Sequence, residues 1–132
     1  MSLEPLAGLV PDAIRVKTSR IVLEGLEVAT DIGFHDFEIG APQRLLVTVE
    51  IWLEDHAPPP NDDPAGAWDY DYLRNAVREL AGERRYNLQE TLAHRIFDRF
   101  AALHGVKALR VSTAKPDIYP DAARVGVEIA SF

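Results

Sequence analysis

The strict alternation of side chains over residues 44–54 places the tightest constraint on how this chain folds. Apolar residues occupy every second position, while Thr48, Glu50 and Glu54 lie on the opposite side of the pattern. The apolar set is Leu45, Val47, Val49, Ile51 and Leu53. Successive side chains of a β-strand point to opposite faces, so a period of two predicts a strand with one buried face. The chain is therefore expected to build a sheet and to cover one side of it.

Three further segments show strand patterns. Residues 21–32 are apolar with partial alternation, and residues 108–113 and 124–131 each place a row of apolar side chains on one face. The connection between the first two strands contains Gly33 and Gly40, which favours a wide loop over a tight turn.

Two segments show the spacing of amphipathic helices. In the first, Leu73, Val77 and Leu80 form one apolar stripe, Asp69 can cap its start, and Gly82 ends it. The second helix is expected over residues 88–103, and Gly105 follows it where a left-handed C-cap belongs. Its stripe consists of Leu88, Leu92, Ile96, Phe100 and Leu103.

The resulting order, β-β-α-α-β-β, predicts an α+β fold in which an antiparallel four-stranded sheet carries two helices on one face. The other face then has no cover within the chain, and Trp52 points toward it. The sheet also has two open edges, which proteins normally protect. Both features predict that several copies assemble through edge pairing and sheet packing.

The length of 132 residues fits one domain, which we expect over residues 20–132. Residues 1–19 contain Pro5, Gly8 and Pro11 and are expected to form a loosely ordered extension. Residues 55–69 contain four prolines and predict a loop.

Composition removes several classes of function. The net charge of −7 disfavours a surface for nucleic acid or anionic membrane, because both need clustered Lys and Arg. The absence of cysteine excludes disulfides, a thiol nucleophile and a cysteine-based zinc site. No apolar run approaches the roughly 20 residues that a membrane span needs. The chain also lacks a basic start followed by an apolar stretch, so we expect no secretory signal and a cytoplasmic location.

The start of the second helix, "NLQETLAHRI", permits two interpretations of Glu90. With Asn87 as N-cap, Glu90 stands three places on, where its side chain folds back to the capping residue in a capping box. Alternatively, a carboxylate held at a helix N-terminus faces a pocket and accepts two parallel N–H donors from a planar, amidine-like ligand edge. Local pattern leaves both open.

Other polar residues have structural interpretations as strong as their catalytic ones. Glu38 fits a solvated loop carboxylate, Tyr70 a packing residue at a helix start, and Lys115 a solvated lysine after a strand or a proton shuttle in a pocket wall. His35 and Asp36 match no metal-ligand spacing, so we expect no metal site.

Four short motifs in this order resemble the dihydroneopterin aldolase family. They are "GFHDFE" in the first loop, "DYDYL" at the first helix, "NLQETLA" at the second helix and "STAKPD" after the third strand. The resemblance covers about residues 20–132. It implies the tunnelling fold, in which four subunits join their sheets into a barrel ring and two rings stack into an octamer, with active sites at subunit interfaces.

The resemblance also implies a reaction, the retro-aldol cleavage of 7,8-dihydroneopterin in folate synthesis, without metal or other cofactor. Glu38 matches the acidic residue that borders the substrate's side chain, and Lys115 matches the lysine placed for water-mediated proton transfer. Tyr70 matches a tyrosine that reaches the neighbouring subunit's pocket, and these three are expected to be the catalytic residues. Glu90 matches the carboxylate that grips the pterin edge. Backbone contacts to substrate are expected from Phe34, Gln89, Trp68 and Asp69.

Two other functions remain open from the sequence. One is epimerisation at C2′ of dihydroneopterin or its triphosphate, which shares the retro-aldol half of the reaction. The other is a non-catalytic pterin- or purine-binding oligomer. The proline-rich loop, the extension and the bulk of Trp68 depart from the family pattern and bear on substrate preference.

Overall fold

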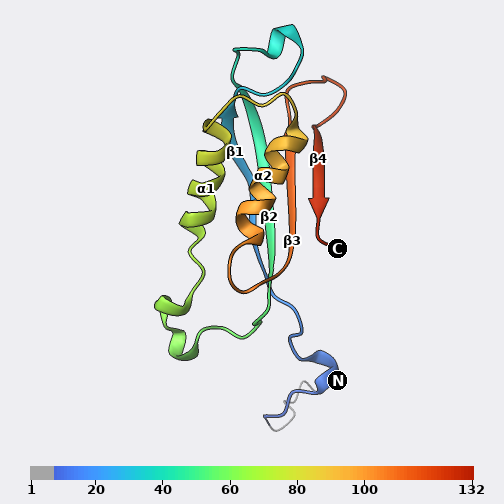
Figure 1. Cartoon of the computed structure of the whole chain (residues 1–132). Helices are drawn as coiled ribbons and strands as arrows, with labels where there is room; N and C mark the ends of the chain where they lie inside the picture. The colour runs from blue at the N-terminus through green and yellow to red at the C-terminus, as the bar shows by residue number, and fades with distance from the viewer. Residues whose placement is uncertain (1–7) are drawn as a thin grey trace.

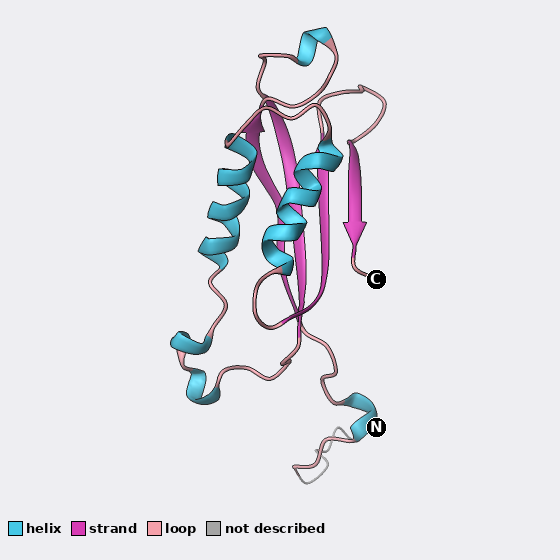
Figure 2. Cartoon of the chain, in the orientation of Figure 1, coloured by secondary structure: helices cyan, strands magenta, loops and turns pink. Residues whose placement is uncertain are grey.

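The computed structural model describes residues 8–132 and confirms the β-β-α-α-β-β order (Figure 1). The elements are β1 Arg20–Thr30, β2 Gln43–Leu53, α1 Tyr70–Gly82, α2 Gln89–Ala101, β3 Val106–Lys115 and β4 Val125–Ala130. The four strands pair in the order β1-β2-β3-β4, every pair antiparallel. Both helices cover the same face of the sheet, as Figure 2 shows. The predicted α+β architecture is therefore correct.

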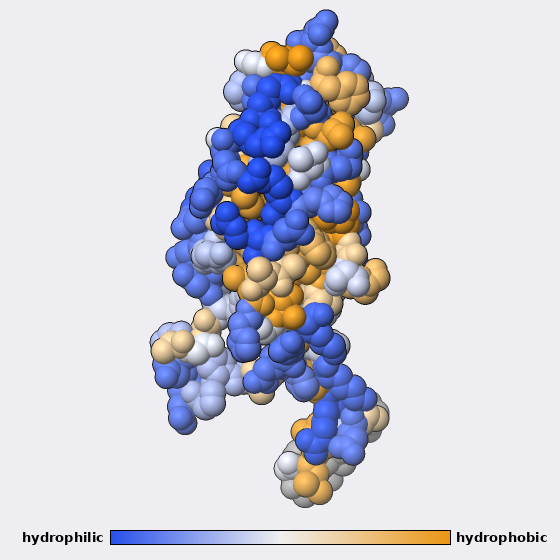
Figure 3. Space-filling model, viewed as in Figure 1, coloured by the Kyte–Doolittle hydropathy of each residue, from blue (hydrophilic) through white to orange (hydrophobic). Residues whose placement is uncertain are grey.

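The core lies between the helices and that face. The alternating residues of β2 are buried from Leu45 to Ile51, and Leu109 and Val111 of β3 continue the same apolar layer. From the helices, the predicted stripes pack onto it, with Leu73, Val77, Leu80, Leu92, Ile96 and Phe100 all buried. The outward faces of α1 and α2 are largely hydrophilic (Figure 3).

Strand β1 carries an irregularity that the sequence pattern showed only as partial alternation. Its register with β2 shifts between Leu23 and Leu26, and Gly25 there has a φ of 62°. The Gly25 N–H donates to Thr48 Oγ1 at 2.9 Å. A bulge at this glycine bends the strand and resets which side chains face the core.

Several boundaries differ from the predictions, and those of β3, β1 and α2 have structural reasons. Strand β3 continues to Lys115, which pairs with Val125 of β4, so Lys115 belongs to the sheet and not to the following loop. The first strand ends at Thr30, and Ile32 instead forms a parallel bridge to Tyr86 ahead of α2. Helix α2 begins and ends inside the predicted range because Leu88 has extended backbone angles and Ala102 already caps the helix.

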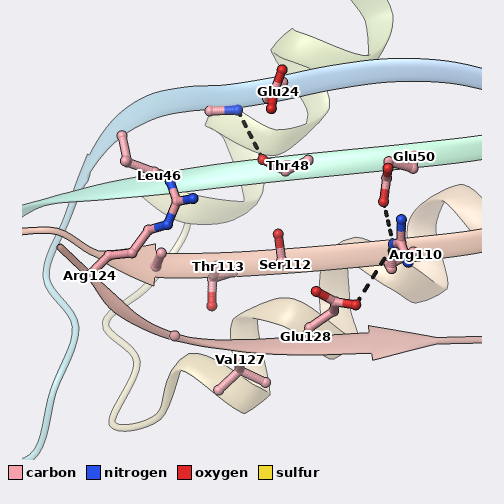
Figure 4. Close-up of a pocket in the computed structure, with 13 residues that line it drawn as sticks. Glu24, Leu46, Thr48, Glu50, Arg110, Ser112, Thr113, Arg124, Val127 and Glu128 are labelled. Atoms are coloured by element: carbon pink, nitrogen blue, oxygen red, sulfur yellow. Dashed lines mark hydrogen bonds and ion pairs between the residues drawn. The ribbon is translucent and has the colours of Figure 1, made fainter. Parts of the chain in front are cut away.

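Within residues 8–132, no helix or strand covers the sheet face opposite the two helices. A polar hollow of about 470 Å³ lies there, and Figure 4 shows the side chains that line it. Arg110 bonds Glu50, and Arg20 Nη1 donates to the same carboxylate at 2.6 Å. Trp52 lies on this face as predicted, edge-on to Phe132 at a centroid distance of 4.9 Å.

The extension and the long loop add little regular structure. Residues 8–19 are mostly exposed and contain one 3-10 turn, Asp12–Ile14, while residues 1–7 lie outside the described part of the chain. The loop before α1 contains the 3-10 turns Pro60–Asp62 and Pro64–Gly66. No helix within residues 8–132 is long and apolar enough to cross a membrane.

Candidate active site

A cavity of about 470 Å³ opens at the end of the molecule where α2 begins. Four segments that are distant in sequence build it: the β1–β2 connection, the start of α2, the end of β3 and the loop leading into β4. Five of the predicted site residues line it, namely Phe34, Glu38, Gln89, Glu90 and Lys115.

A buried ion pair forms part of the cavity wall. Lys115 Nζ donates to Glu38 Oε2 at 2.6 Å, and the two residues are only 9% and 5% exposed. The antiparallel pairing of β3 with β2 brings the end of β3 beside the β1–β2 connection, which explains how residues far apart in sequence meet. A buried lysine and carboxylate in direct contact are suited to exchanging protons with a bound molecule.

Further donors surround the Glu38 carboxylate. Gln43 Nε2 donates to Glu38 Oε2 at 3.0 Å and to the Ile32 carbonyl at 2.5 Å, and the His35 N–H approaches Oε1 at 3.4 Å. Burial by itself raises the pKa of the Glu38 carboxyl, but the hydrogen bonds from Lys115 and Gln43 outweigh it and hold that pKa below its ordinary value. Glu38 is therefore ionised at neutral pH.

Gly33 makes room for this carboxylate. Its φ is 126°, and a Cβ atom built there would collide with the Glu38 carboxyl group. Glycine is consequently required at this position for two reasons, its backbone conformation and the closeness of Glu38.

Of the two interpretations of Glu90, the capping box is wrong. The N-cap is Leu88, not Asn87, and no side chain caps this helix. The Asn87 side chain is engaged elsewhere, because its Oδ1 accepts a hydrogen bond from Arg85 Nη1 at 2.8 Å. Glu90 is thus the second residue of the helix, exposed at the cavity, where the positive end of the helix dipole favours a carboxylate.

Gln89 secures the start of α2 with its side chain. Its Oε1 accepts from Thr113 Oγ1 at 2.8 Å, and its Nε2 donates to the Val125 carbonyl at 3.4 Å. The amide group therefore ties α2 to β3 and β4 and fixes where Glu90 stands.

The rim of the cavity is apolar and exposed. Phe34 is 62% exposed, and sequence reasoning missed its neighbours on the rim, Phe37, Leu88 and Tyr119. His35 stacks on Phe37 with an interplanar angle of 2°. Such a ring of exposed apolar groups around a polar wall is typical of a site that a planar ligand or a second subunit covers.

Three predicted site residues lie elsewhere. Trp68, Asp69 and Tyr70 are at the start of α1, at the opposite end of the helix layer from the start of α2 (Figure 1). Asp69 caps α1 as predicted, since its Oδ1 accepts from the N–H groups of Asp71 at 2.9 Å and Tyr72 at 3.4 Å. One copy of the chain therefore does not bring all eight predicted residues together.

Comparison with known proteins decides the family. The family model for dihydroneopterin aldolase matches residues 21–130. The chain belongs to the dihydroneopterin aldolase family. The Escherichia coli (strain K12) dihydroneopterin aldolase is 28% identical over 109 residues, which cover 83% of this chain and 89% of that protein. The enzyme class of this chain is accordingly that of a lyase, an aldolase of pterin metabolism.

Solved structures of the family agree with the fold. The Burkholderia thailandensis dihydroneopterin aldolase bound to guanine is 33% identical with a TM-score of 0.74, and the match covers 86% of this chain and 89% of that one. The Escherichia coli enzyme in complex with neopterin is 26% identical with a TM-score of 0.78, and the match covers 86% and 99%.

Proposed function

We propose that this chain cleaves 7,8-dihydroneopterin into 6-hydroxymethyl-7,8-dihydropterin and glycolaldehyde in folate biosynthesis. The observation that carries the proposal is the buried Lys115–Glu38 pair in the wall of a cavity that also presents the Glu90 carboxylate. A proton-exchanging pair and a separate carboxylate at a helix N-terminus suit the two ends of a dihydropterin, its reactive side chain and its amino-pyrimidinone edge.

The reaction breaks the bond between C1′ and C2′ of the substrate. A base removes the proton of the C2′ hydroxyl, the C1′–C2′ electron pair moves through C6 onto N5, which takes up a proton, and glycolaldehyde leaves. Return of a proton to C1′ and loss of the N5 proton give the hydroxymethyl product. Because the substrate's N5=C6 imine accepts the electrons, the reaction requires neither a lysine Schiff base nor a metal.

Lys115 and Glu38 are proposed to move these protons. Among the described residues that line the cavity, Lys115 is the one Lys or Arg. The ionised Glu38 holds the ammonium group in the wall, where it can donate toward N5 through a water molecule, and Glu38 borders the substrate's hydroxyl groups.

Glu90 is proposed to anchor the pterin. A dihydropterin presents its 2-amino group and N3–H side by side, and a carboxylate can accept both in parallel, which gives a strong and directional contact. Guanine and neopterin share this amino-pyrimidinone edge, and relatives of this chain are solved with each of them. Phe34 and Gln89 would contribute backbone contacts beside it.

Tyr70, Trp68 and Asp69 are proposed to complete the site of a neighbouring copy. Their place at the far end of the helix layer separates them from the cavity of their own chain. Strands β1 and β4 are the two edges of the sheet, so edge pairing between copies would form the barrel ring of the tunnelling fold, stacked in pairs as an octamer.

Product analysis tests the activity. Wild-type protein is incubated with 7,8-dihydroneopterin in EDTA, and the products are separated by chromatography. We expect 6-hydroxymethyl-7,8-dihydropterin, whereas 7,8-dihydromonapterin as the main product would indicate an epimerase, and bound but unconverted substrate a pterin-binding oligomer. Loss of turnover in EDTA would contradict the metal-free reaction.

The single Lys or Arg among the described lining residues also predicts no preference for the triphosphate substrate, which would need additional cations.

A further inference from the structure

Arg85 links the β1–β2 connection, which carries Glu38, to the segment before α2, which leads to Glu90, and it does not itself line the cavity. It lies between α1 and α2, and its side chain is 27% exposed. Its guanidinium group contacts two segments at once. It donates to the Gly33 carbonyl in the β1–β2 connection, and to Asn87 Oδ1 at 2.8 Å just before α2.

An acidic residue, Asp31, makes a third contact with the guanidinium group. Arg85 Nε lies 3.2 Å from Asp31 Oδ1, an ion-pair contact that lacks the alignment of a hydrogen bond. The same Asp31 oxygen accepts the N–H of Gly40 at 3.2 Å. Arg85 and Asp31 together therefore brace both ends of the connection that carries Glu38.

The backbone that Arg85 contacts positions Glu38 on one side of the cavity and Glu90 on the other. Gly33 lies directly against the Glu38 carboxyl group, and its N–H donates to the Tyr86 carbonyl at 2.9 Å. The Tyr86 N–H returns a bond to the Asp31 carbonyl at 3.1 Å. Two residues after Asn87, α2 begins and soon presents Glu90. Arg85 thus stands where the Glu38 side of the cavity and the Glu90 side are joined.

We propose that Arg85 is a positioning residue of the aldolase reaction, which sets the separation between the pterin anchor Glu90 and the Lys115–Glu38 pair. This role rests on the function proposed above. The planar fork of arginine suits it, because one guanidinium can bond several fixed acceptors in different directions, whereas a lysine offers a single point of charge. Loss of the guanidinium group leaves the β1–β2 connection and the start of α2 folded, but it lets the distance between Glu90 and the Lys115–Glu38 pair vary.

The expected signature of this role is a lower kcat with nearly unchanged pterin affinity. In Arg85→Met, Glu90 still grips the pterin edge, so the Kd for neopterin should change by less than about threefold. The reactive carbons are then held less well against Lys115, and small misplacements of reacting atoms cost up to about 100-fold in rate. We expect kcat to fall by about 10- to 100-fold, and Arg85→Lys to lie between Arg85→Met and wild type.

The experiment compares wild type, Arg85→Met, Arg85→Lys and the control Arg78→Met, whose side chain is exposed on α1. For each, kcat with 7,8-dihydroneopterin, Kd for neopterin by calorimetry and the folded fraction by circular dichroism are measured. An Arg85→Met protein with the wild-type kcat per folded subunit would overturn the proposal and leave Arg85 a purely structural residue. A raised Kd with unchanged kcat would overturn it as well.

Two further outcomes also have a definite meaning for the proposal. If Arg85→Met does not fold, Arg85→Lys takes its place, with a lowered kcat supporting the proposal and a wild-type kcat contradicting it. If wild type and Arg78→Met fail to cleave the substrate, the proposed function itself is wrong, which is a different result from normal turnover in every variant.

Discussion

Lys115 Nζ and Glu38 Oε2 lie 2.6 Å apart although 77 residues separate them in the sequence. The end of β3 and the β1–β2 connection bring them together, and Gly33 makes room for the carboxylate. The pair is buried yet adjoins a cavity, and its burial costs desolvation that the contact between the two charges must offset. Ionisable groups placed in this way beside a cavity are candidates for a functional site.

The Glu38 carboxylate should make the stability of the protein depend on acid pH. The pKa of Glu38 in the folded state lies below the ordinary value of 4.5. Its contribution to the free energy of unfolding is therefore complete above pH 4.5 and is lost as the pH falls through the folded-state pKa. Glu38→Gln should therefore be less stable than wild type at pH 7, by about 1.5–3 kcal/mol for a charged hydrogen bond. The difference should shrink as the pH is lowered from 5 to 3.

Urea unfolding at fixed protein concentration measures this difference. Glu79→Gln is the control, because Glu79 is exposed on α1. A gap between wild type and Glu38→Gln that stays constant across this range would show that the Glu38 carboxyl is not held ionised by its partners.

Glu90→Ala should weaken pterin binding more than it changes the rate with bound substrate. Removal of a carboxylate that accepts two N–H groups is expected to raise the Kd for neopterin or guanine by about 10- to 100-fold. Calorimetry measures it, with Glu79→Ala as the matched control. Equal affinity in the Glu90 and Glu79 variants would exclude Glu90 as the anchor.

Tyr70 should act on the site of a neighbouring copy. Tyr70→Ala and Lys115→Ala are each expected to be nearly inactive alone. After the two proteins are mixed by co-expression, random pairing gives roughly one quarter of the sites an intact Lys115 from one copy and an intact Tyr70 from the next. Activity of the mixture should recover to about that fraction, whereas no recovery would place Tyr70 in the site of its own chain.

The layered fold was predictable because it follows from local periodicity. The alternation around Val47 and Val49 indicated β2 and its buried face, and the stripe through Leu73 and Val77 indicated α1. The open sheet face followed from the order of the elements, and Trp52 lies on it.

Details of the site depend on contacts between distant residues, which a local pattern does not contain. The capping box at α2 was a sound interpretation of "NLQE", but Arg85 occupies the Asn87 side chain and the helix starts later. Lys115 was expected after the end of the strand at residue 113, yet pairing with Val125 extends β3 to include it.

Partners of Glu38 were hidden from sequence reasoning for the same reason. Gln43 opens β2 with no distinguishing pattern, and its bonds to Glu38 and Ile32 appear only when the β1–β2 connection folds over it. Arg85 follows Arg84 in the sequence with no distinguishing pattern, although it reaches Gly33, 52 residues away.

The most direct test of the account measures turnover and binding in Lys115→Ala beside wild type and the control Lys17→Ala, whose side chain is exposed. With 7,8-dihydroneopterin, wild type and Lys17→Ala should release 6-hydroxymethyl-7,8-dihydropterin and glycolaldehyde in equal amounts. Lys115→Ala should bind neopterin within about threefold of the wild-type Kd while its rate falls by roughly 100- to 10,000-fold, the range for loss of a positioned acid–base group. A Lys115→Ala protein that cleaves the substrate at the wild-type rate would contradict the assignment of the reaction to this cavity.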